Sequence, residues 1–539
     1  HPGRGGRPET RRPGRSGMKK ILLALVGLAV VASLVVSAVR RSDAGPKPIE
    51  ALRQTYRQKT KPSVDHALFT QLKGPFAKPQ QVTAACVSCH NGRASEVMAS
   101  SHWNWERLEY VEGKGIRAIG KKNVLNNFCI GVAGSQQSCD KCHAGYGWAD
   151  SKFDFNDPLN VDCLACHDNG GTYAKKVGGA GMPAEGLDLA LVAQKVGRPQ
   201  RANCGTCHFL GGGGNNVKHG DLETAMFDTT RDVDVHMGTD GADMSCVDCH
   251  RAVKHQMLGK AYSLSSMNRN RVACESCHGA VPHEDDLLNQ HGYKVACQTC
   301  HIPEFAKVNA TKMTWDWSTA GKLKDGKPYE EEDGQGNHAY MSIKGTFTWA
   351  KNVKPEYAWF DGTASHYLLG EKFDPSRPLV LNPLFGEYDE PDAKIVPVKV
   401  HRAKQIYDTK NLTLIQPKLF SSVPGDGGYW TEFDWQKAAA AGMKEVGLPY
   451  SGSYGFASTE MNWPVNHMVA PKGKAVSCEE CHTRTGGRLA SVGGFYMPGR
   501  DRSRWLDGLG AILLLGTFAG VLFHGGARYW FWRRRQGGK

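Results

Sequence analysis

Two long apolar stretches lie near the ends of the chain, and little regular periodicity lies between them. The first runs from Ile21 to Val36 and the second from Leu506 to Trp532. Between them, residues 187–196 (LDLALVAQKV) form one of the few clear helical patterns, and the run Gly211–Gly214 predicts a loop. A chain with so little aliphatic periodicity needs another source of apolar filling for its core.

The first apolar stretch has the features of an export signal. Positive charge at residues 18–20 precedes the run, and cleavage after Ala38 or after Ala44 fits the usual preference for small residues. Because the run is long for a signal peptide, an uncleaved N-terminal anchor is the alternative. Residues 18–44 are therefore predicted to export the chain, and the arginine-rich residues 1–17 are interpreted as a non-native leader.

The second apolar stretch predicts a transmembrane helix. It ends in the aromatic residues Tyr529, Trp530 and Trp532 and is followed by Arg533–Arg535. This length, aromatic belt and trailing positive charge fit a helix whose C-terminus lies in the cytoplasm. An amphipathic surface helix is the alternative.

Composition adds one anomaly, the 17 cysteines among 539 residues. Such a number suggests disulfides in an exported protein or zinc sites in a cytosolic one, so the spacing of the cysteines has to decide. The formal net charge of +14 would suggest nucleic acid or anionic lipid, but part of this charge lies in the leader.

The spacing is C-x-x-C-H, and it occurs eight times. Two thiols three positions apart reach the two vinyl groups of one haem, and the adjacent imidazole is held under the iron. Zinc sites and disulfides need no histidine directly after every second cysteine. The motif cysteines are Cys86, Cys89, Cys139, Cys142, Cys163, Cys166, Cys204, Cys207, Cys246, Cys249, Cys274, Cys277, Cys297, Cys300, Cys478 and Cys481. The proximal histidines that they predict are His90, His143, His167, His208, His250, His278, His301 and His482.

Eight covalently attached c-type haems are therefore the predicted cofactors. Their propionates would add roughly sixteen negative charges against the positive surplus, so no nucleic-acid partner is predicted. One cysteine remains, Cys129, ten residues before the second motif. It is either a small buried apolar residue or a thiol near a haem edge that engages a sulfur substrate.

Histidines in short polar contexts among the motifs are predicted to be the distal iron ligands. Seven such candidates for eight irons would leave one iron open to a substrate. The predicted distal ligands are His102, His219, His236, His255, His283, His291 and His467, and the remaining candidates are His66, His338, His366 and His401.

The order of the motifs and the segments between them resemble a known family. CDKCHAGYGWADSKFDF, VDCLACH, KVACQTCHIPEFA, SIKGTFTWAKNVKPEY and EMNWPVNHMVAPK are similar to segments of octahaem tetrathionate reductase-type cytochromes c, in the hydroxylamine oxidoreductase-like multihaem group. The resemblance spans roughly residues 81–482. It implies a closely packed haem array with seven bis-histidine haems, and a second-motif haem that has a lysine as its distal ligand and is the active site.

The lysine implied by this resemblance is expected to be Lys152, with Lys344 as the fallback. An amine binds iron only when it is neutral, so protonation can displace it. In the predicted mechanism Cys129 and Asp150 assist the sulfur or proton chemistry. Related nitrite-reducing enzymes carry C-x-x-C-K, which does not occur here.

Basic residues in the cysteine-free segment suit an anionic substrate through charge-assisted hydrogen bonds. His401 and Arg402 are the predicted catalytic residues there, and ordinary solvated surface is the alternative. The other basic candidates are Lys344, Lys351, Lys354 and Lys404.

The predicted fold class is mainly α with much irregular structure, a multihaem cytochrome c with a haem-packed core and a C-terminal transmembrane helix. The predicted organisation is a leader at 1–17, a signal peptide or anchor at 18–44, a seven-haem region at 45–301, a haem-free substrate or cover lobe at 302–477, the eighth motif with its linker at 478–502, and the transmembrane helix with a basic tail at 503–539.

The predicted function is a respiratory reductase of tetrathionate or a related sulfur or nitrogen oxyanion, placed on the periplasmic side of the cytoplasmic membrane. The membrane helix suggests an integral quinol-oxidising cytochrome b-type partner. A pure electron conduit in which every haem is six-coordinate is the alternative, and a hydroxylamine- or nitrite-converting enzyme is a third.

Overall fold

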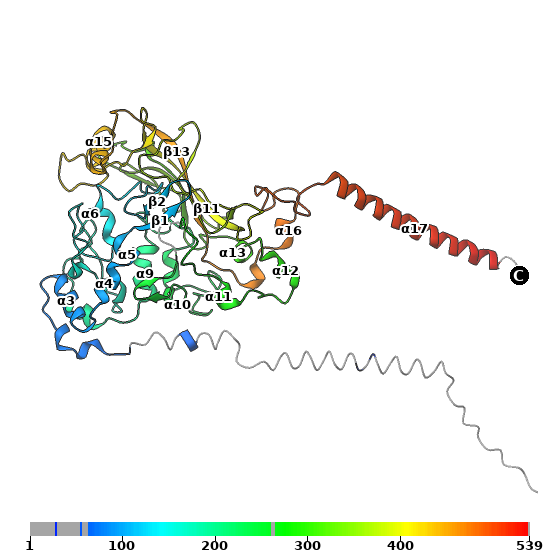
Figure 1. Ribbon diagram of the computed structural model, residues 1–539, viewed down its shortest axis with the longest axis horizontal. Coiled ribbons are helices and arrows are strands. Elements are labelled where there is room, and N and C mark those ends of the chain that lie inside the picture. Colours follow the sequence, from blue (N-terminus) through cyan, green and yellow to red (C-terminus); the bar gives the residue numbers. More distant parts are fainter. Residues whose placement is uncertain (1–26, 28, 30–53, 57–62, 260–264, 537–539) are drawn as a thin grey trace, which may run out of the picture.

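The computed structural model describes residues 54–56, 63–259 and 265–536, together with the single positions 27 and 29. Figure 1 shows a folded unit from which one long helix, α17 (Arg504–Gln536), departs. The predicted leader and the predicted signal segment lie outside the described residues, apart from those two positions.

The part of the chain that carries the cysteine motifs is called here the motif body, residues 63–259, 265–301 and 465–503. Its helices are short, and most of them coincide with a motif. One helical turn places two cysteines at positions i and i+3 on the same face. Acidic residues inside two of these turns stabilise the helix start, because Asp248 accepts from the Ser245 amide (2.8 Å) and Glu480 from the Ser477 amide (3.2 Å).

The α-helices of the motif body are α3 (Pro79–Cys89), α4 (Arg93–Met98), α5 (Ser101–Asn104), α6 (Gln136–Cys139), α7 (Leu164–His167), α8 (Leu189–Gln194), α9 (Arg201–His208), α10 (Cys246–Cys249), α11 (Glu275–His278), α12 (Asp286–His291), α13 (Cys297–His301) and α16 (Cys478–Cys481). Its 3₁₀ turns are η1 (His66–Leu68), η2 (Thr70–Leu72), η3 (Asp140–Cys142), η4 (Pro158–Asn160), η5 (Thr224–Phe227) and η7 (Lys472–Lys474).

Residues 302–464 form a second region, the sheet lobe, around a nine-stranded sheet. Its path is β10-β13-β11-β5-β8-β7-β6, and β9 and β12 also pair with β11. The long strand β11 runs antiparallel to β13 and parallel to β5. The strands are β5 (Thr311–Asp316), β6 (Glu330–Glu332), β7 (His338–Met341), β8 (Gly345–Ala350), β9 (Glu356–Phe360), β10 (Leu379–Val380), β11 (Lys394–Asp408), β12 (Thr413–Leu414) and β13 (Tyr454–Pro464), with helices α14 (Tyr429–Glu432), α15 (Trp435–Glu445) and η6 (Trp317–Thr319). The motif body adds two hairpins, β1 (Arg107–Val111) with β2 (Gly115–Ile119) and β3 (Ala252–Val253) with β4 (Gln256–Met257).

Aromatic side chains fill the core of the sheet lobe. Trp315 and Trp317 stack with ring centres 4.8 Å apart, and Trp435 of α15 stacks on Tyr429 at 3.7 Å. Helix α15 begins where the Asp434 carboxylate accepts from a backbone amide, and it buries its apolar face on this core. The lobe therefore has an apolar core of its own.

Two segments of the motif body are built into that same core. Leu125, Phe128 and Ile130 from the first segment and Val217 from the second pack in one buried cluster with Trp315. The residues next to these anchors, in positions 126–132 and 216–221, therefore lie at the seam between the motif body and the sheet lobe.

The prediction of a mainly α fold is only partly right. Helix accounts for 30% and strand for 18% of the residues that the structure describes, so the content is mixed. The sheet lobe supplies most of the strand. Buried and more exposed positions alternate over part of β11, where His401 and Ala403 are buried and Arg402 is exposed, and over residues 457–463 of β13. Short alternating runs of this kind are weak signals in a single sequence.

Candidate functional site

Seven motif histidines each face a second histidine across a gap of nearly constant width. The ring centres of each pair lie 6.0–6.4 Å apart. Metal–imidazole bonds are about 2 Å long, so one iron between two facing rings separates their centres by roughly 6 Å. The pairs, motif histidine first, are His90–His66, His167–His255, His208–His102, His250–His467, His278–His236, His301–His283 and His482–His291.

Hydrogen bonds at Nδ1 orient several of these rings so that Nε2 is left for a metal. The Nδ1 atoms of His167, His250 and His482 bond to backbone carbonyls at 2.8, 2.8 and 2.7 Å. Such outer contacts fix the tautomer of a ligating imidazole and raise its basicity.

Two of the opposing histidines are oriented in the same way. The Nδ1 atom of His255 bonds to Glu96 at 2.9 Å, and that of His291 bonds to the Leu287 carbonyl at 2.8 Å. Both sides of these gaps are therefore prepared to present Nε2 to an iron.

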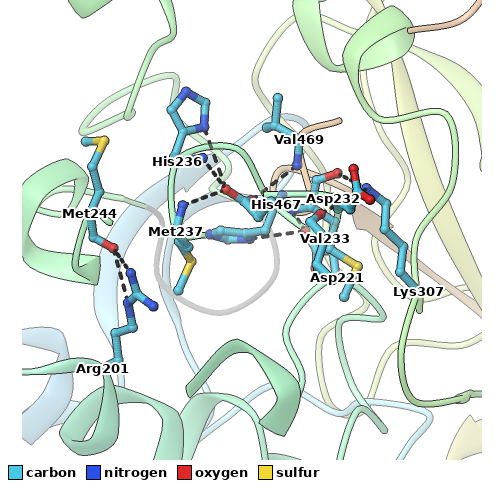
Figure 2. Close-up of polar contacts among 12 residues, drawn as sticks. Arg201, Asp221, Asp232, Val233, His236, Met237, Met244, Lys307, His467 and Val469 are labelled. Atoms are coloured by element: carbon cyan, nitrogen blue, oxygen red, sulfur yellow. Dashed lines mark hydrogen bonds and ion pairs between the residues drawn. The ribbon is translucent and has the colours of Figure 1, made fainter. Parts of the chain in front are cut away.

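Two further opposing histidines share one polar network, which Figure 2 shows. Asp221 accepts from the backbone amide of His467 (2.9 Å) and contacts its Nδ1 at 3.1 Å. The buried Asp234 accepts from the amides of His236 (2.8 Å) and Met468 (2.8 Å). One pair of carboxylates therefore holds the loops of two opposing histidines from distant parts of the chain.

Six of the seven histidines predicted as distal ligands stand opposite a motif histidine. The seventh, His219, lies instead against Trp463 with ring centres 4.9 Å apart. His66, on the first turn of the described motif body, takes the corresponding place opposite His90 at 6.2 Å. The geometry favours His66 over His219. The sequence analysis placed His66 only among the remaining candidates because it lies outside the motif-dense segment.

The second motif differs from the other seven. The Nε2 atom of His143 lies 2.6 Å from the Trp103 carbonyl, so the nitrogen that would bind iron is used by the backbone. Aromatic rings surround the imidazole, with Trp148 and Trp103 at 4.9 and 5.1 Å, and in the described part of the chain no second imidazole faces it. Burial lowers the pKa of His143 to about 3. The proximal ligand role of His143 stays a prediction, and its ring is oriented differently from those of the other seven motif histidines.

Lysines surround the second motif in place of a partner imidazole. Lys175 is held by Asp162 (2.9 Å) and by the His143 carbonyl (2.6 Å). Lys121 lies over the Trp105 ring, 4.0 Å from its centre. Lys218 lies deeper, and burial first and then Lys121 lower its pKa to about 7.

Lys218 projects from the seam between motif body and sheet lobe. Its Nζ lies 5.0 Å from the centre of the Trp463 ring and 5.8 Å from that of Phe128. Cys142 of the second motif is close enough to influence the pKa of this amine. Among the lysines near the motif, Lys218 therefore combines partial burial, proximity to the attachment cysteines and a pKa that allows a neutral amine.

Cys129 lies beside the second motif and within a cluster of positive charge. A contact with the Cys139 thiol is the largest influence on Cys129 and lowers its pKa, whereas burial raises it. Lys344, Lys121 and Lys312 lower the pKa further. When Cys139 is bonded to a haem its thiol no longer makes this contact, but the effect of the three lysines remains.

One acidic residue was missed by the sequence analysis. Asp140 lies between the two cysteines of the second motif, is fully buried, and has no hydrogen-bond partner on either carboxylate oxygen among the described residues. Burial raises its pKa to about 7, against the opposing effect of Lys175. A carboxyl that is partly uncharged at neutral pH next to the motif is a source of a proton.

Four predicted catalytic residues do not line the cavity at the second motif. Asp150 and Lys152 are exposed, and the Asp150 carboxylate accepts from the Lys152 backbone amide (2.8 Å). His401 is buried under the sheet, where its Nδ1 contacts Asn127 at 3.0 Å. Arg402 is on the opposite, exposed face of β11 and is paired with a glutamate on β9 at 2.8 Å. Alternation along the strand places these last two side chains on different faces.

Among the other basic candidates, Lys344 is the one that lines the interior cavity near Cys129. Its Nζ lies against the glycine run at residues 211–214, 3.4 Å from where a Cβ on Gly213 would be. Lys404 is instead paired with an aspartate of β5 at 3.4 Å, and Lys351 and Lys354 are exposed.

Contacts between cysteines of different motifs order the eight motifs in space. Hydrogen-bonding thiols join the second and fourth motifs (Cys142 with Cys207), and the fourth and fifth (Cys204 with Cys246). The fifth motif lies beside the sixth, and the seventh lies beside the eighth. A contact between the Cys274 and Cys297 thiols joins the sixth to the seventh. The first motif contacts the third in the same way, and the third lies beside the fourth. The array is a branched chain with the second and eighth motifs at separate ends.

A connected cavity of about 4810 Å³ is lined by all eight motif histidines and by the seven histidines opposite them. Three features fit covalently bound haem. They are the thiol pairs available for thioether bonds, the imidazoles spaced for one iron between them, and an interior cavity that reaches all of these residues. Together these features define a multihaem c-type cytochrome, in which the haem irons supply the redox chemistry.

Comparison with known proteins agrees with this class. A family profile described as bacterial cytochrome c matches residues 312–485. The crystal structure of an octahaem cytochrome c from Shewanella oneidensis is 45% identical and has a TM-score of 0.75, and the match covers 81% of this chain and 98% of that one. An uncharacterised protein from Archaeoglobus fulgidus is 23% identical over 247 residues, which are 36% of this chain and 80% of that protein. The chain belongs to the octahaem c-type cytochromes of the tetrathionate reductase type.

Proposed function

We propose that this protein carries eight haems and reduces tetrathionate, or a related sulfur or nitrogen oxyanion, at the second-motif haem. The observation that supports this is the contrast between seven motif histidines with a facing imidazole and one, His143, whose Nε2 is bonded to a backbone carbonyl. Six-coordinate haems exchange electrons but offer no position for a substrate, so the exceptional site is the one suited to chemistry.

In this proposal Lys218, and not Lys152, would be the lysine that holds the second-motif haem iron. Its amine lines the cavity near Cys142, and its pKa is lowered to about 7, chiefly by burial. Lys399 orients the segment that bears Lys218, because the Lys399 Nζ donates to the carbonyls of Val217 (2.9 Å) and Lys218 (3.2 Å).

In this proposal Lys121 and Lys344, whose charges act on Cys129, give the site its preference for anions, and Lys218 joins them when it is protonated and leaves the iron. All three amines line the cavity beside the second motif. Charge-assisted hydrogen bonds from ammonium groups hold sulfur and nitrogen oxyanions. With tetrathionate, two electrons cleave the central S–S bond and yield two thiosulfates, so the reduction consumes no proton. For substrates whose reduction consumes protons, Asp140 is the residue placed to donate one.

Helix α17 is the proposed membrane anchor. In the part of the chain that the structure describes, it is the one helix long and apolar enough to cross a membrane, with a mean hydropathy of 1.9 in its most apolar stretch. Arg533–Arg535 at its end favour a C-terminus in the cytoplasm and a motif body outside it. A quinol-oxidising integral membrane protein is the proposed electron donor.

Reoxidation of the reduced holoprotein tests the activity. The protein is reduced with a titrated reductant and mixed in parallel with tetrathionate, sulfite, nitrite and hydroxylamine, and the haem bands are followed. We expect rapid reoxidation by tetrathionate, with two electrons consumed per anion. Eight inert low-spin haems that none of the four compounds reoxidises would contradict the proposal and favour a pure electron conduit.

A further inference from the structure

The eighth motif lies at one end of the array of motifs. More motifs separate it from the second motif than separate any other motif from the second. The sequence of neighbouring motifs between them is seventh, sixth, fifth and fourth. Figure 1 places α16 of the eighth motif, together with α12, on the side of the folded unit from which α17 departs. The eighth haem is therefore the terminal one on the side of the proposed membrane anchor.

The chain between the eighth motif and α17 is called here the strap, residues 483–503. It is folded against the protein. Leu489, Val492 and Met497 are buried in one cluster with Tyr357 of β9 and Ile395 of β11. The strap is thus anchored on the edge of the sheet lobe.

Arg500 links distant residues of the strap to one another through hydrogen bonds. Its guanidinium donates to the carbonyls of Leu489 (2.9 Å), Val492 and Phe495 (2.9 Å), and it pairs with Asp501 at 2.7 Å. An indole from β9 adds a bond of 2.9 Å to a carbonyl in the middle of the strap. The strap is therefore held to the folded unit as far as its last few residues before α17.

The strap also contacts the haem ligand directly. The Pro498 carbonyl lies 2.7 Å from Nδ1 of His482. Gly499 makes this approach possible, because its φ is +83° and a Cβ there would lie 2.7 Å from the His482 carbonyl oxygen. Only the short segment from Pro498 to Arg504 then leads to α17, which limits the distance between these two residues to about 20 Å.

We propose that the eighth-motif haem is where electrons enter the protein, and that the strap holds this haem beside the membrane surface, facing a membrane-embedded quinol-oxidising donor. This inference rests on the proposed function for its membrane anchor and its direction of electron flow. In the step itself the quinol releases two electrons and two protons in the donor, and each electron converts one Fe(III) of the array to Fe(II). The two protons leave the donor for the aqueous phase.

The first test measures electron injection from the membrane. Full-length holoprotein is placed in phosphatidylcholine vesicles that contain an alkyl-chain ruthenium tris-bipyridine photosensitiser. A flash transfers one electron from the excited complex to a nearby haem. The eighth haem is identified by repeating the measurement in a His291→Met background, which shifts its spectrum. We expect the eighth haem to be reduced first.

A matched variant separates proximity from other effects. A flexible spacer of about ten residues inserted between Ser503 and Arg504 leaves the strap and its contacts intact and adds up to about 35 Å of reach. Injection from the membrane sensitiser is expected to fall at least about tenfold, whereas injection from a water-soluble ruthenium complex stays the same. Equal rates with and without the spacer, or first reduction of another haem, would overturn the inference.

The second test concerns the contact between strap and ligand. Gly499→Ala forces the chain away from His482, and Gly486→Ala is the control because its φ is also positive, +68°, but its added Cβ meets nothing within 4 Å. Loss of the Pro498 carbonyl makes the His482 imidazole less basic, so one of the eight midpoint potentials should become more positive in Gly499→Ala only. Unchanged potentials in both variants would refute the role of the strap.

Failure of this inference and failure of the proposed function give different results. Turnover of tetrathionate with a soluble reductant does not require the strap. If that turnover is present but the spacer has no effect, the entry site is wrong and the reductase proposal stands. If injection behaves as expected but no oxyanion is reduced, the reductase proposal is wrong and the entry site stands.

Discussion

The motif body and the sheet lobe of this chain are organised in different ways. The sheet lobe has regular strand pairing and an aromatic core in which Trp315, Trp317 and Trp463 are almost fully buried. The motif body consists of short helices and loops around a cavity of about 4810 Å³. The first region is held by its own side chains, whereas the second is arranged around covalently bound haem.

This contrast bears on where the chemistry is placed. The seven histidine-paired sites are made from the motif body, with both imidazoles supplied by its short helices and loops. The second-motif site instead includes two residues from the seam, Cys129 and Lys218. Each directly follows a residue, Phe128 or Val217, that is packed in the core of the sheet lobe. A rigid protein core positions the residues of the exceptional site.

Removing the seam lysine should have the largest effect. We expect Lys218→Ala to lower the rate of oxyanion reduction by about 10- to 100-fold and to change the spectrum of one haem, leaving the other seven low-spin. Steady-state turnover and electron paramagnetic resonance of the oxidised protein measure this. Lys176→Ala, at an exposed lysine paired with Glu185, is the control. If the two variants behave alike, Lys218 is not the ligand.

The next test is inside the motif body. His66→Ala should make the first-motif haem five-coordinate, with one low-spin signal replaced by a high-spin one, while His219→Ala keeps all seven low-spin signals. The reason is that His66 faces His90 at 6.2 Å and His219 faces Trp463. The opposite pattern would restore His219 as the distal ligand. Magnetic circular dichroism counts the low-spin haems in both variants.

A smaller effect is expected from the lysine that links the two regions. Lys399 is 1% exposed and donates to the carbonyls of Val217 and Lys218 and to Thr311 Oγ1 (2.7 Å). Lys399→Met leaves these acceptors unpaired, which costs about 1–3 kcal/mol of stability, and we expect about a tenfold loss of turnover.

The spectrum of the second-motif haem should shift in this variant, which a purely structural role would not cause. Lys404→Met, on the exposed face of the same strand, is the matched control for thermal unfolding and for the spectrum. A destabilised variant with normal turnover and a normal second-motif spectrum would assign Lys399 to stability alone.

The smallest predicted effect concerns the stability of the sheet lobe and involves Asp408, a buried residue at the end of β11. Burial raises the pKa of Asp408, but donors from Asn411 and Ser451 outweigh it and leave the pKa below its ordinary value. The folded-state pKa is therefore below the unfolded value of about 3.9. The stabilisation is present above that value and is lost as the pH falls through the lowered pKa.

Asp408→Asn should thus destabilise the protein at neutral pH and make its stability less dependent on pH below about 4. Chemical unfolding followed by tryptophan fluorescence at several pH values measures this, with the exposed Asp389→Asn as control. The spectra of the eight haems should not change. A steeper acid dependence in Asp408→Asn than in the parent would contradict the assignment.

Much of the site could be predicted from the sequence because its signals are local. Each Cys-x-x-Cys-His motif fits in one helical turn, and short polar contexts around histidines such as His102 and His467 marked six of the opposing imidazoles. His66 was placed only among the remaining candidates because it precedes the motifs. Lys152 was chosen for its nearness in sequence to the second motif, yet it is exposed. Lys218 follows the fourth motif in the chain and approaches the second motif only through folding.

The sheet lobe was the least predictable part. Its strands are short or only partly alternating, and β11 joins four other strands that come from before and after it in the chain. His401 and Arg402 were adjacent basic residues in the sequence, and the strand directs one into the interior and the other to Glu356 on the surface. Strand pairing of this kind depends on contacts between distant residues, which a local pattern does not contain.

The amino-acid sequence is enough to specify the cofactor chemistry, because thioether attachment needs two thiols and an imidazole within five consecutive residues. It also specifies the apolar stretch that forms α17, because length and hydropathy are properties of a continuous segment. The folded chain was needed to learn which histidine faces which motif, that His143 is turned to the Trp103 carbonyl, and that Lys218 reaches the second motif. Those features depend on distances between residues far apart in the chain, and the packing of the two regions against each other sets these distances.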